Sequence, residues 1–220
     1  CIFEYIYFSR PDSLINNISV YEYRKKLGAK LAKESHIDSD LIVPVPDSGV
    51  PAAIGYSEEI KKNIELGIIR NHYVGRTFIE PTQQIRSFGV KLKHNTNKSL
   101  IKNKSLVLID DSLVRGTTSI KIIKMLYDAG AKEVHLRIAS PPIKYPDYYG
   151  VDTPNQNELL ASKFNLEGMR KFINATTLQF LSIEGLYISM GYEKRNSSYP
   201  QFTDHCFTGE YPVKPIDASD

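Results

Sequence analysis

The sequence has few cysteines, little net charge and no long hydrophobic run. Two of its 220 residues are cysteines, and Cys1 and Cys206 lie near opposite ends of the chain. Two thiols so placed make neither a disulfide framework nor a C-x-x-C metal site. No segment approaches the roughly 18 consecutive apolar residues of a membrane span, and none has the pattern of a signal peptide. We therefore expect a cytoplasmic protein that has no membrane partner.

The small net charge is unevenly distributed. The 28 Lys and Arg residues and 25 Asp and Glu residues leave +3, which is too little to indicate a nucleic-acid partner. The segment from Arg70 to Lys104, however, holds eight basic residues and one acid, Glu80, and so carries +7. Such a segment is suited to a polyanionic ligand.

Composition and length indicate a folded domain with an appendage, since 41% of the residues are hydrophobic and 24% are charged. Short apolar runs predict strands at 41–45, 67–70, 106–109 and 133–139, and amphipathic segments predict helices at 20–32, 50–62 and 119–129. Strands that alternate with helices form parallel βαβ units. We therefore predict a three-layer α/β fold whose ligand binds at the carboxyl ends of the strands.

The two ends of the chain lack this alternation. Residues 1–8 are rich in aromatic and β-branched side chains and have no start methionine, which predicts a strand that continues from an upstream segment. After residue 140, helices are predicted around 157–162, 165–174 and 182–190, and residues 191–220 show no period. We divide the chain into an N-terminal strand and linker (1–20), a core (21–150), and C-terminal helices with a peripheral tail (151–220).

The segment 106–119 combines two features that suit a phosphorylated sugar. Its apolar strand ends in Asp110 and Asp111, and adjacent carboxylates can hold ribose hydroxyls and a hydrated Mg²⁺. The following loop places Gly116 and three hydroxyl residues at the start of a helix, where backbone amides bind phosphate. Helix capping would explain either feature alone. The carboxylate pair and the loop that follows it come together directly after a buried strand, and this combination favours a site for a phosphorylated ribose.

The same run contains the 13-residue signature of the phosphoribosyltransferases, which bind phosphoribosyl pyrophosphate. Segments 1–13, 43–50, 71–79 and 139–143 further resemble the glutamine phosphoribosylpyrophosphate amidotransferase family, and the resemblance extends over about residues 1 to 190. It implies a type I phosphoribosyltransferase fold with a C-terminal helical appendage and tail. The implied reaction is the first step of purine synthesis, a Mg²⁺-dependent glycosyl transfer in which ammonia and phosphoribosyl pyrophosphate give 5-phosphoribosylamine and diphosphate.

Members of this family also carry an N-terminal glutaminase domain, whose catalytic cysteine precedes a glycine. That domain is expected to be missing here, and because Cys1 precedes Ile2 we do not assign Cys1 as a nucleophile. Free ammonia is then the expected nitrogen source for this chain. The resemblance also implies a homo-oligomer and feedback inhibition by purine nucleotides.

By position, the resemblance assigns roles to individual side chains. Asp110 and Asp111 are expected to bind Mg²⁺ and the ribose, and Ser48 to supply a further metal ligand. Arg76 is expected to stabilise the departing diphosphate, so Arg76, Asp110 and Asp111 are the predicted catalytic residues. The remaining predicted substrate contacts are the pyrophosphate loop (Asp47, Ser48, Gly49), a lid (Tyr73, Phe78, with Ile79 beside them along an ammonia path) and the 5′-phosphate loop (Ser112, Arg115, Gly116, Thr117, Thr118, Ser119).

Many members of the family hold an iron–sulfur cluster through four cysteines. Cys1 and Cys206 stand at two of those places, but Asp147 and Thr203 stand at the other two. Four thiolates are the usual requirement, so we expect no cluster. His135 lies inside a predicted strand and is expected to be structural.

Two other functions fit the phosphate-binding segment. A regulator could bind phosphoribosyl pyrophosphate without turning it over, but such proteins usually carry a DNA-binding module, and no helix-turn-helix or basic arm is evident here. A salvage phosphoribosyltransferase would need a hood that stacks a purine or pyrimidine ring, and no segment matches one.

Overall fold

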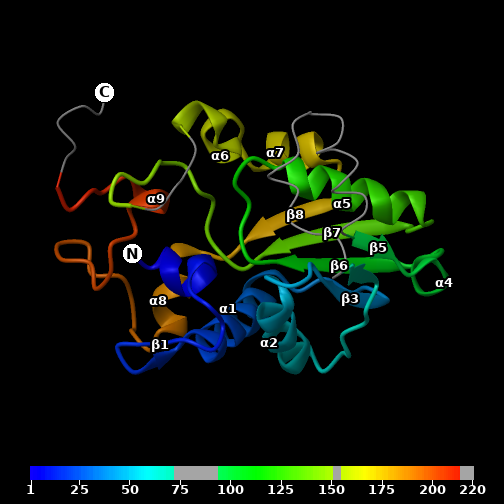
Figure 1. Cartoon of the computed structure of the whole chain (residues 1–220), viewed down its shortest axis with the longest axis horizontal. Helices are drawn as coiled ribbons and strands as arrows, with labels where there is room; N and C mark the ends of the chain where they lie inside the picture. The colour runs from blue at the N-terminus through cyan, green and yellow to red at the C-terminus, as the bar shows by residue number, and fades with distance from the viewer. Residues whose placement is uncertain (72–93, 151–154, 214–220) are drawn as a thin grey trace.

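A four-stranded parallel β-sheet forms the centre of the structure, a computed structural model that describes residues 1–71, 94–150 and 155–213 (Figure 1). The strand order is β3-β6-β7-β8, and every neighbouring pair is parallel. The strands are β3 (Leu41–Pro44), β6 (Ser105–Asp110), β7 (Glu133–Ile138) and β8 (Thr177–Phe180).

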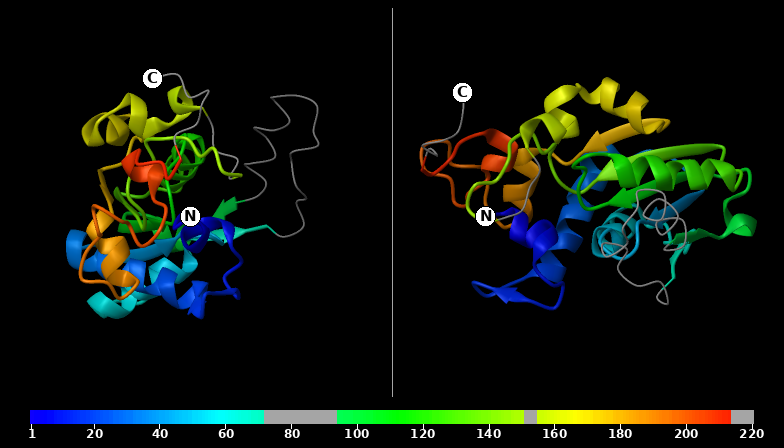
Figure 2. Two further views of the ribbon diagram at one scale, coloured as in Figure 1. Left: turned by 90° about the vertical axis from the view of Figure 1, so that its left-hand side faces the viewer. Right: turned by 45° about the horizontal axis from the view of Figure 1, so that its top comes forward.

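Helices cover both faces of this sheet. α1 (Val20–Ser35) and α2 (Val50–Ile60) lie on one face, and α5 (Thr117–Asp128) and α7 (Leu166–Ile173) lie on the other (Figures 1 and 2). The predicted three-layer α/β fold is confirmed. The predicted helices 20–32, 50–62 and 119–129 correspond to α1, α2 and α5.

The side chains of β6 explain why its sequence is an unbroken apolar run. Leu106 and Leu108 pack into a cluster with residues of α5 and α7, whereas Val107 and Ile109 pack into a second cluster with residues of α1 and α2. Successive side chains of a strand point to opposite faces. Because both faces of this sheet are covered by helices, each of these four positions must be apolar.

The other elements are short and surround this core. They are η1 (Glu4–Phe8), β1 (Leu14–Ile15), β2 (Ile18–Ser19), β4 (Ile68–Arg70), β5 (His94–Thr96), α4 (Lys98–Ile101), η3 (Gln156–Glu158), α6 (Leu160–Lys163), α8 (Ile183–Ser189) and α9 (His205–Thr208). The predicted strand 67–70 exists as β4, but it pairs antiparallel with β5 outside the central sheet. Among the described residues, no helix has the length and apolar character needed to cross a membrane.

The strand predicted for residues 1–8 is wrong, because this segment forms the π-helix Glu4–Phe8. Carbonyl groups of this segment accept hydrogen bonds from a side chain and not from a neighbouring strand. The Arg24 guanidinium of α1 donates to the carbonyl oxygens of Tyr5 and Ser9, at 2.9 and 2.8 Å. Aromatic and β-branched residues are common in buried segments as well as in strands. In this segment most of them are buried without forming a strand.

Strand β8 was not predicted, and it corrects the description of residues 151–220 as helices and a tail. Thr177–Phe180 pairs with β7 and completes the central sheet. β8 has only four residues and lies between two helices, so its alternation of apolar and polar side chains is too short to predict a strand. The central sheet therefore crosses the boundary that the sequence placed at residue 150.

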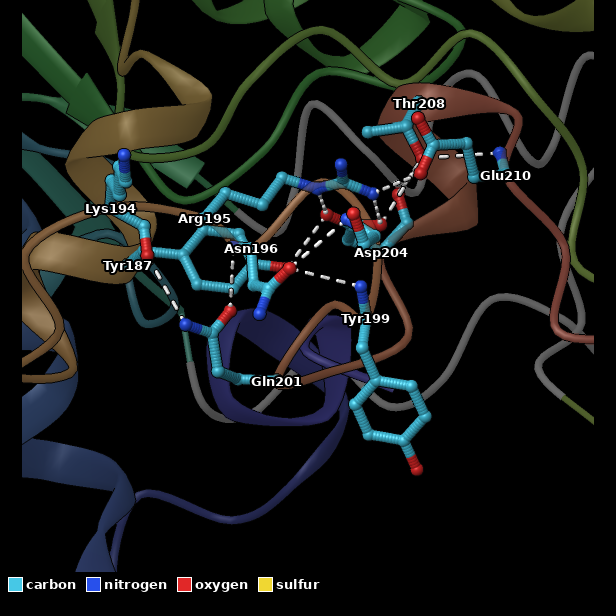
Figure 3. A network of polar contacts seen from close by, with 10 residues as sticks. Tyr187, Lys194, Arg195, Asn196, Tyr199, Gln201, Asp204, Thr208 and Glu210 are labelled. Carbon is cyan, nitrogen blue, oxygen red and sulfur yellow. Dashed lines mark hydrogen bonds and ion pairs between the residues drawn. The ribbon is translucent and has the colours of Figure 1, made fainter.

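The peripheral tail predicted after residue 190 is also wrong for residues 204–207, which are all buried. Asp204 accepts hydrogen bonds from Arg195 at 2.6 and 3.1 Å and from the Tyr187 hydroxyl of α8 at 2.7 Å (Figure 3). Arg195 also pairs with Glu210 at 2.5 Å. Isolated polar contacts of this kind have no periodicity, so sequence patterns do not reveal them.

The predicted structural role of His135 is consistent with its contacts in the sheet. His135 of β7 contacts the Ser105 hydroxyl of β6 at 3.2 Å and the Thr177 hydroxyl of β8 at 3.0 Å. Burial, together with the charge of Arg137, lowers its pKa below the ordinary value of a histidine, although Glu133 at 3.6 Å acts in the opposite direction.

His135 should therefore make stability depend on pH. Since the folded pKa is the lower one, the unfolded chain takes up this proton first, and stability is lost as pH falls from about 6.5 through the folded pKa. Urea unfolding of the wild type and His135→Gln between about pH 5 and 7.5 measures the effect. We expect the pH slope to be smaller in the variant, and identical slopes would contradict the assignment.

Candidate functional site

The segments that follow β3 and β6 run to opposite faces of the sheet, and a crevice lies between them at the carboxyl ends of the strands. β3 continues through α2 on one face, after which Ile64 bridges to Ile42 at the outer edge of β3. β6 continues through α5 on the opposite face to β7. A point where successive connections run in opposite directions is where open parallel sheets bind ligands.

A pocket of about 470 Å³ lies at this crevice. Two segments form most of it: the loop after β3 contributes Val45, Pro46 and Ser48, and the chain from the end of β6 to the start of α5 contributes every residue from Asp110 to Ser119. The remaining lining residues are Phe3, Tyr7, Phe8, His94 and Ile143. The structure thus brings together Ser48, Asp110, Asp111, Ser112 and the predicted 5′-phosphate loop.

The two carboxylates lie at the floor of the pocket, where water has little access. Asp110 ends β6, and its Oδ1 accepts hydrogen bonds from the Asp111 backbone amide at 3.0 Å and from the Ser48 hydroxyl at 3.4 Å. The Ser112 hydroxyl donates to Asp111 Oδ2 at 2.6 Å. Burial, and then the neighbouring charge of Asp111, raise the pKa of Asp110 well above its ordinary value.

This arrangement of oxygen atoms suits a hard cation. Two carboxylates and the Ser48 hydroxyl are the kind of ligands that Mg²⁺ takes, usually together with water and substrate phosphate. A cation here would offset the repulsion between the two adjacent carboxylates. The residues present therefore fit the Mg²⁺ that the sequence predicted.

The start of α5 provides the complementary anion site. Gly116 is the residue before the helix, with a φ of +77°, and it carries no side chain that could cap the helix. The first backbone amides of a helix have no partner within the helix, and the first turn of α5 contains no acidic residue. Thr117, Thr118 and Ser119 all line the pocket, so the first amides of α5 and three hydroxyl side chains lie together there, which is the chemistry of a phosphate site.

The loop after β3 lies directly against β6. A β-carbon added at Gly49 would lie 2.4 Å from the carbonyl oxygen of Ile109, so only glycine fits there. Ser48 lines the pocket, whereas Asp47 forms an ion pair with Arg70. Neither Asp47 nor Gly49, both predicted substrate contacts, is among the described residues that line the pocket.

Other predicted residues lie at the edge of the pocket or outside the description. Arg115 lines the pocket and pairs with Glu158 at 2.9 Å on an exposed surface. Tyr73, Arg76, Phe78 and Ile79 lie outside the described residues, so their predicted roles stay predictions.

Sequence reasoning missed an aromatic wall formed by Phe3, Tyr7 and Phe8. Burial, and then the negative charges of Asp111 and Asp110, raise the pKa of Tyr7. The Tyr7 hydroxyl is therefore close enough to the carboxylates to sense their charge. The aromatic richness of residues 1–8 was visible in the sequence, but the strand prediction gave it no place at the site.

Arg24 holds this wall in position, and its removal should loosen it. In Arg24→Met the carbonyl oxygens of Tyr5 and Ser9 lose their charged donor, which costs about 1.5–3 kcal/mol per bond at most. We expect faster amide hydrogen exchange confined to residues 2–9, measured by mass spectrometry, and weaker substrate binding. Exposed Arg10, which pairs only with Asp12 among the described residues, gives the matched control Arg10→Met. Equal exchange in the two variants would contradict the role of Arg24.

Residues 17–141 match the phosphoribosyl transferase domain family, and the chain belongs to this family. Its more specific relatives are amidophosphoribosyltransferases. The chain is 59% identical over 218 residues to the amidophosphoribosyltransferase of Rhizobium etli, a match that covers 99% of this chain and 44% of that protein. It is 50% identical over 214 residues to the Bacillus subtilis protein of the same name, covering 97% of this chain and 45% of that one.

Solved structures give the same result. Glutamine phosphoribosylpyrophosphate amidotransferase from B. subtilis, complexed with ADP and GMP, matches with a TM-score of 0.88 and 48% identity, covering 100% of this chain and 48% of that one. The predicted type I phosphoribosyltransferase fold and the resemblance to this family are confirmed. The chain spans less than half the length of these relatives.

The four positions assigned to iron–sulfur ligands lie outside the pocket. The Ile2 amide donates to the Thr203 carbonyl oxygen at 2.9 Å, which places Thr203 beside the first residues of the sequence. With only two cysteines in the sequence, the residues cannot supply four thiolates and do not fit such a cluster. Its expected absence stays a prediction.

Proposed function

We propose that this chain is the phosphoribosyl-transfer part of an amidophosphoribosyltransferase. The proposed reaction joins ammonia to phosphoribosyl pyrophosphate and gives 5-phosphoribosylamine and diphosphate. One observation carries the proposal: the Asp110–Asp111 pair and the start of α5 line the same pocket, at the switch point of the sheet. A phosphorylated ribose offers a phosphate to the helix start and hydroxyl groups to the carboxylates.

Each end of the pocket takes one part of this substrate. The amides and hydroxyls of residues 116–119 would bind the 5′-phosphate, and Asp110 and Asp111 would accept hydrogen bonds from the ribose hydroxyls. Ser48 would face the diphosphate from the opposing loop. Mg²⁺, held by Asp110, Asp111 and Ser48, would supply positive charge to the departing diphosphate.

The chemistry needs no side-chain nucleophile. The bond between ribose C1 and the diphosphate oxygen breaks, and the diphosphate leaves with the electron pair. The lone pair of ammonia forms the new bond to C1, and the proton that this nitrogen sheds passes to solvent. The residues of this chain would bind the two charged ends and hold the ribose between them, with Phe3, Tyr7 and Phe8 as one wall of the pocket.

Further roles are carried over from the sequence analysis. Arg76 is proposed to stabilise the diphosphate, and glutamine is the proposed source of ammonia in a longer protein. Inhibition by purine nucleotides is proposed because the B. subtilis structure is a complex with ADP and GMP. A homo-oligomer and a cytoplasmic location also remain proposals. The non-catalytic regulator is not favoured, since the curated relatives above are named as transferases.

The experiment is diphosphate release from phosphoribosyl pyrophosphate with Mg²⁺, measured with and without ammonium. We expect release that depends on both. In parallel reactions, adenine or uracil replaces ammonium as the acceptor. Release that needs a free base would favour a salvage enzyme, and calorimetric binding of substrate with no release under any condition would favour the regulator.

A further inference from the structure

Three side chains with different metal-binding groups meet beside the contact between Ile2 and Thr203. The Cys1 thiol, an Asp147 carboxylate oxygen and a ring nitrogen of His205 all lie within 4.8 Å of one another. Cys1 precedes η1, Asp147 follows β7, and His205 begins α9. None of the three lines the substrate pocket, so this cluster is separate from the proposed Mg²⁺ ligands.

Two of the three side chains are buried, Cys1 is only partly buried, and one buried polar atom of the cluster has no partner. The side chains of His205 and Asp147 are 0% and 2% exposed, and His205 Nε2 lies 2.6 Å from Asp147 Oδ2. His205 Nδ1 is buried and has no hydrogen-bond partner. A histidine placed only for hydrogen bonding normally satisfies both nitrogens, as His135 does with Ser105 and Thr177.

Surrounding groups fix the orientation of the cluster. The Tyr149 and Tyr211 rings pack on the His205 ring with centroids 5.2 and 5.1 Å away. The Tyr149 amide donates to Asp147 Oδ1 at 2.7 Å. Outer groups of this kind hold metal ligands in place, and a simple hydrogen-bonded pair of Asp147 and His205 explains neither the nearby thiol nor the unpartnered nitrogen.

We propose that the Cys1 thiolate, the Asp147 carboxylate and the His205 imidazole bind one divalent ion of the zinc class, with water as the fourth ligand. Sulfur, nitrogen and oxygen donors in a set of three suit Zn²⁺ with one open position. They do not suit an iron–sulfur cluster, which requires four thiolates, or Mg²⁺, which takes oxygen ligands. The ion would join the N-terminal segment, which carries the aromatic wall of the pocket, to the buried segment 204–207.

The test measures zinc and cobalt binding by the purified, reduced chain. We expect about one Zn²⁺ per chain to remain after gel filtration. Co²⁺ in its place should give a thiolate charge-transfer band, and added Zn²⁺ should raise the melting temperature. Cys1→Ser should abolish the charge-transfer band and weaken zinc affinity by at least about 100-fold, and Asp147→Asn should weaken it by about 10- to 100-fold.

Two controls separate this site from other metal binding. Cys206→Ser removes the other thiol and His36→Gln removes an exposed histidine, and both variants should retain zinc. Since Cys1 is only partly buried, Cys1→Ser is expected to fold, and circular dichroism checks this. Zinc affinity that is unchanged in Cys1→Ser, or lost in Cys206→Ser instead, would overturn the proposal, as would the absence of any zinc binding in the wild type.

Discussion

Replacing Asp111 with asparagine is expected to lower kcat for ammonium-dependent diphosphate release by about 1000-fold, while the protein stays folded. The substitution keeps the size of the side chain and removes its charge. Asp111 then no longer attracts a cation or the positive charge that develops on the ribose as diphosphate leaves. The measurement is steady-state release of diphosphate with saturating ammonium and Mg²⁺.

Although Asp111→Asn should lose activity, we expect it to be no less stable than the wild type. Asp110 is buried, and the charge of Asp111 is the second cause of its raised pKa, after burial. Removing that charge relieves a repulsion between neighbours, so Asp111→Asn should melt at the same temperature as the wild type or higher. A loss of activity that accompanied a lower melting temperature would instead indicate unfolding.

Asp128 provides the matched control. It is the last residue of α5, does not line the pocket, and pairs on the surface with Lys124 at 3.1 Å. Asp128→Asn should leave kcat unchanged. If Asp111→Asn retained more than about a tenth of the activity, the role of this carboxylate in turnover would be rejected.

Replacing Gly28 with alanine is expected to destabilise the fold by about 3 kcal/mol. α1 and α2 approach each other so closely that a β-carbon at Gly28 would lie 1.8 Å from the Ala52 carbonyl oxygen. A β-carbon at Gly55 would lie 1.8 Å from the Lys25 carbonyl oxygen. Because the obstructing atoms belong to the backbone, the helices themselves must separate.

Thermal unfolding measures this effect, and a loss of about 3 kcal/mol corresponds to a fall in Tm of about 6–12 °C for a chain of this size. Lys26→Ala, on the exposed side of the same helix, should change stability by less than about 0.5 kcal/mol. A fall in Tm of less than about 2 °C for Gly28→Ala would show that the helices separate easily. Since α1 also carries Arg24, we expect the aromatic wall to loosen in Gly28→Ala.

The centre of the fold and the polar part of the site were predictable because both depend on local patterns. An apolar run such as residues 106–109 is buried on two faces wherever it occurs, so it predicts a strand of a covered parallel sheet. The carboxyl end of such a strand lies at the ligand-binding edge. The positions of Asp110, Asp111 and the loop up to Ser119 therefore followed from the order of residues along the chain.

Three features depended on contacts between distant segments and could not be read in this way. Arg24 binds the carbonyl oxygens of Tyr5 and Ser9 in and just after the helix Glu4–Phe8, and the four residues of β8 form a strand because β7 offers an edge. Asp147 and His205 are 58 positions apart. Periodicity reports which side of an element is buried, but it carries no information about which distant side chain lies opposite. The meeting of Cys1, Asp147 and His205 therefore arises only when three segments that are far apart in the sequence pack together.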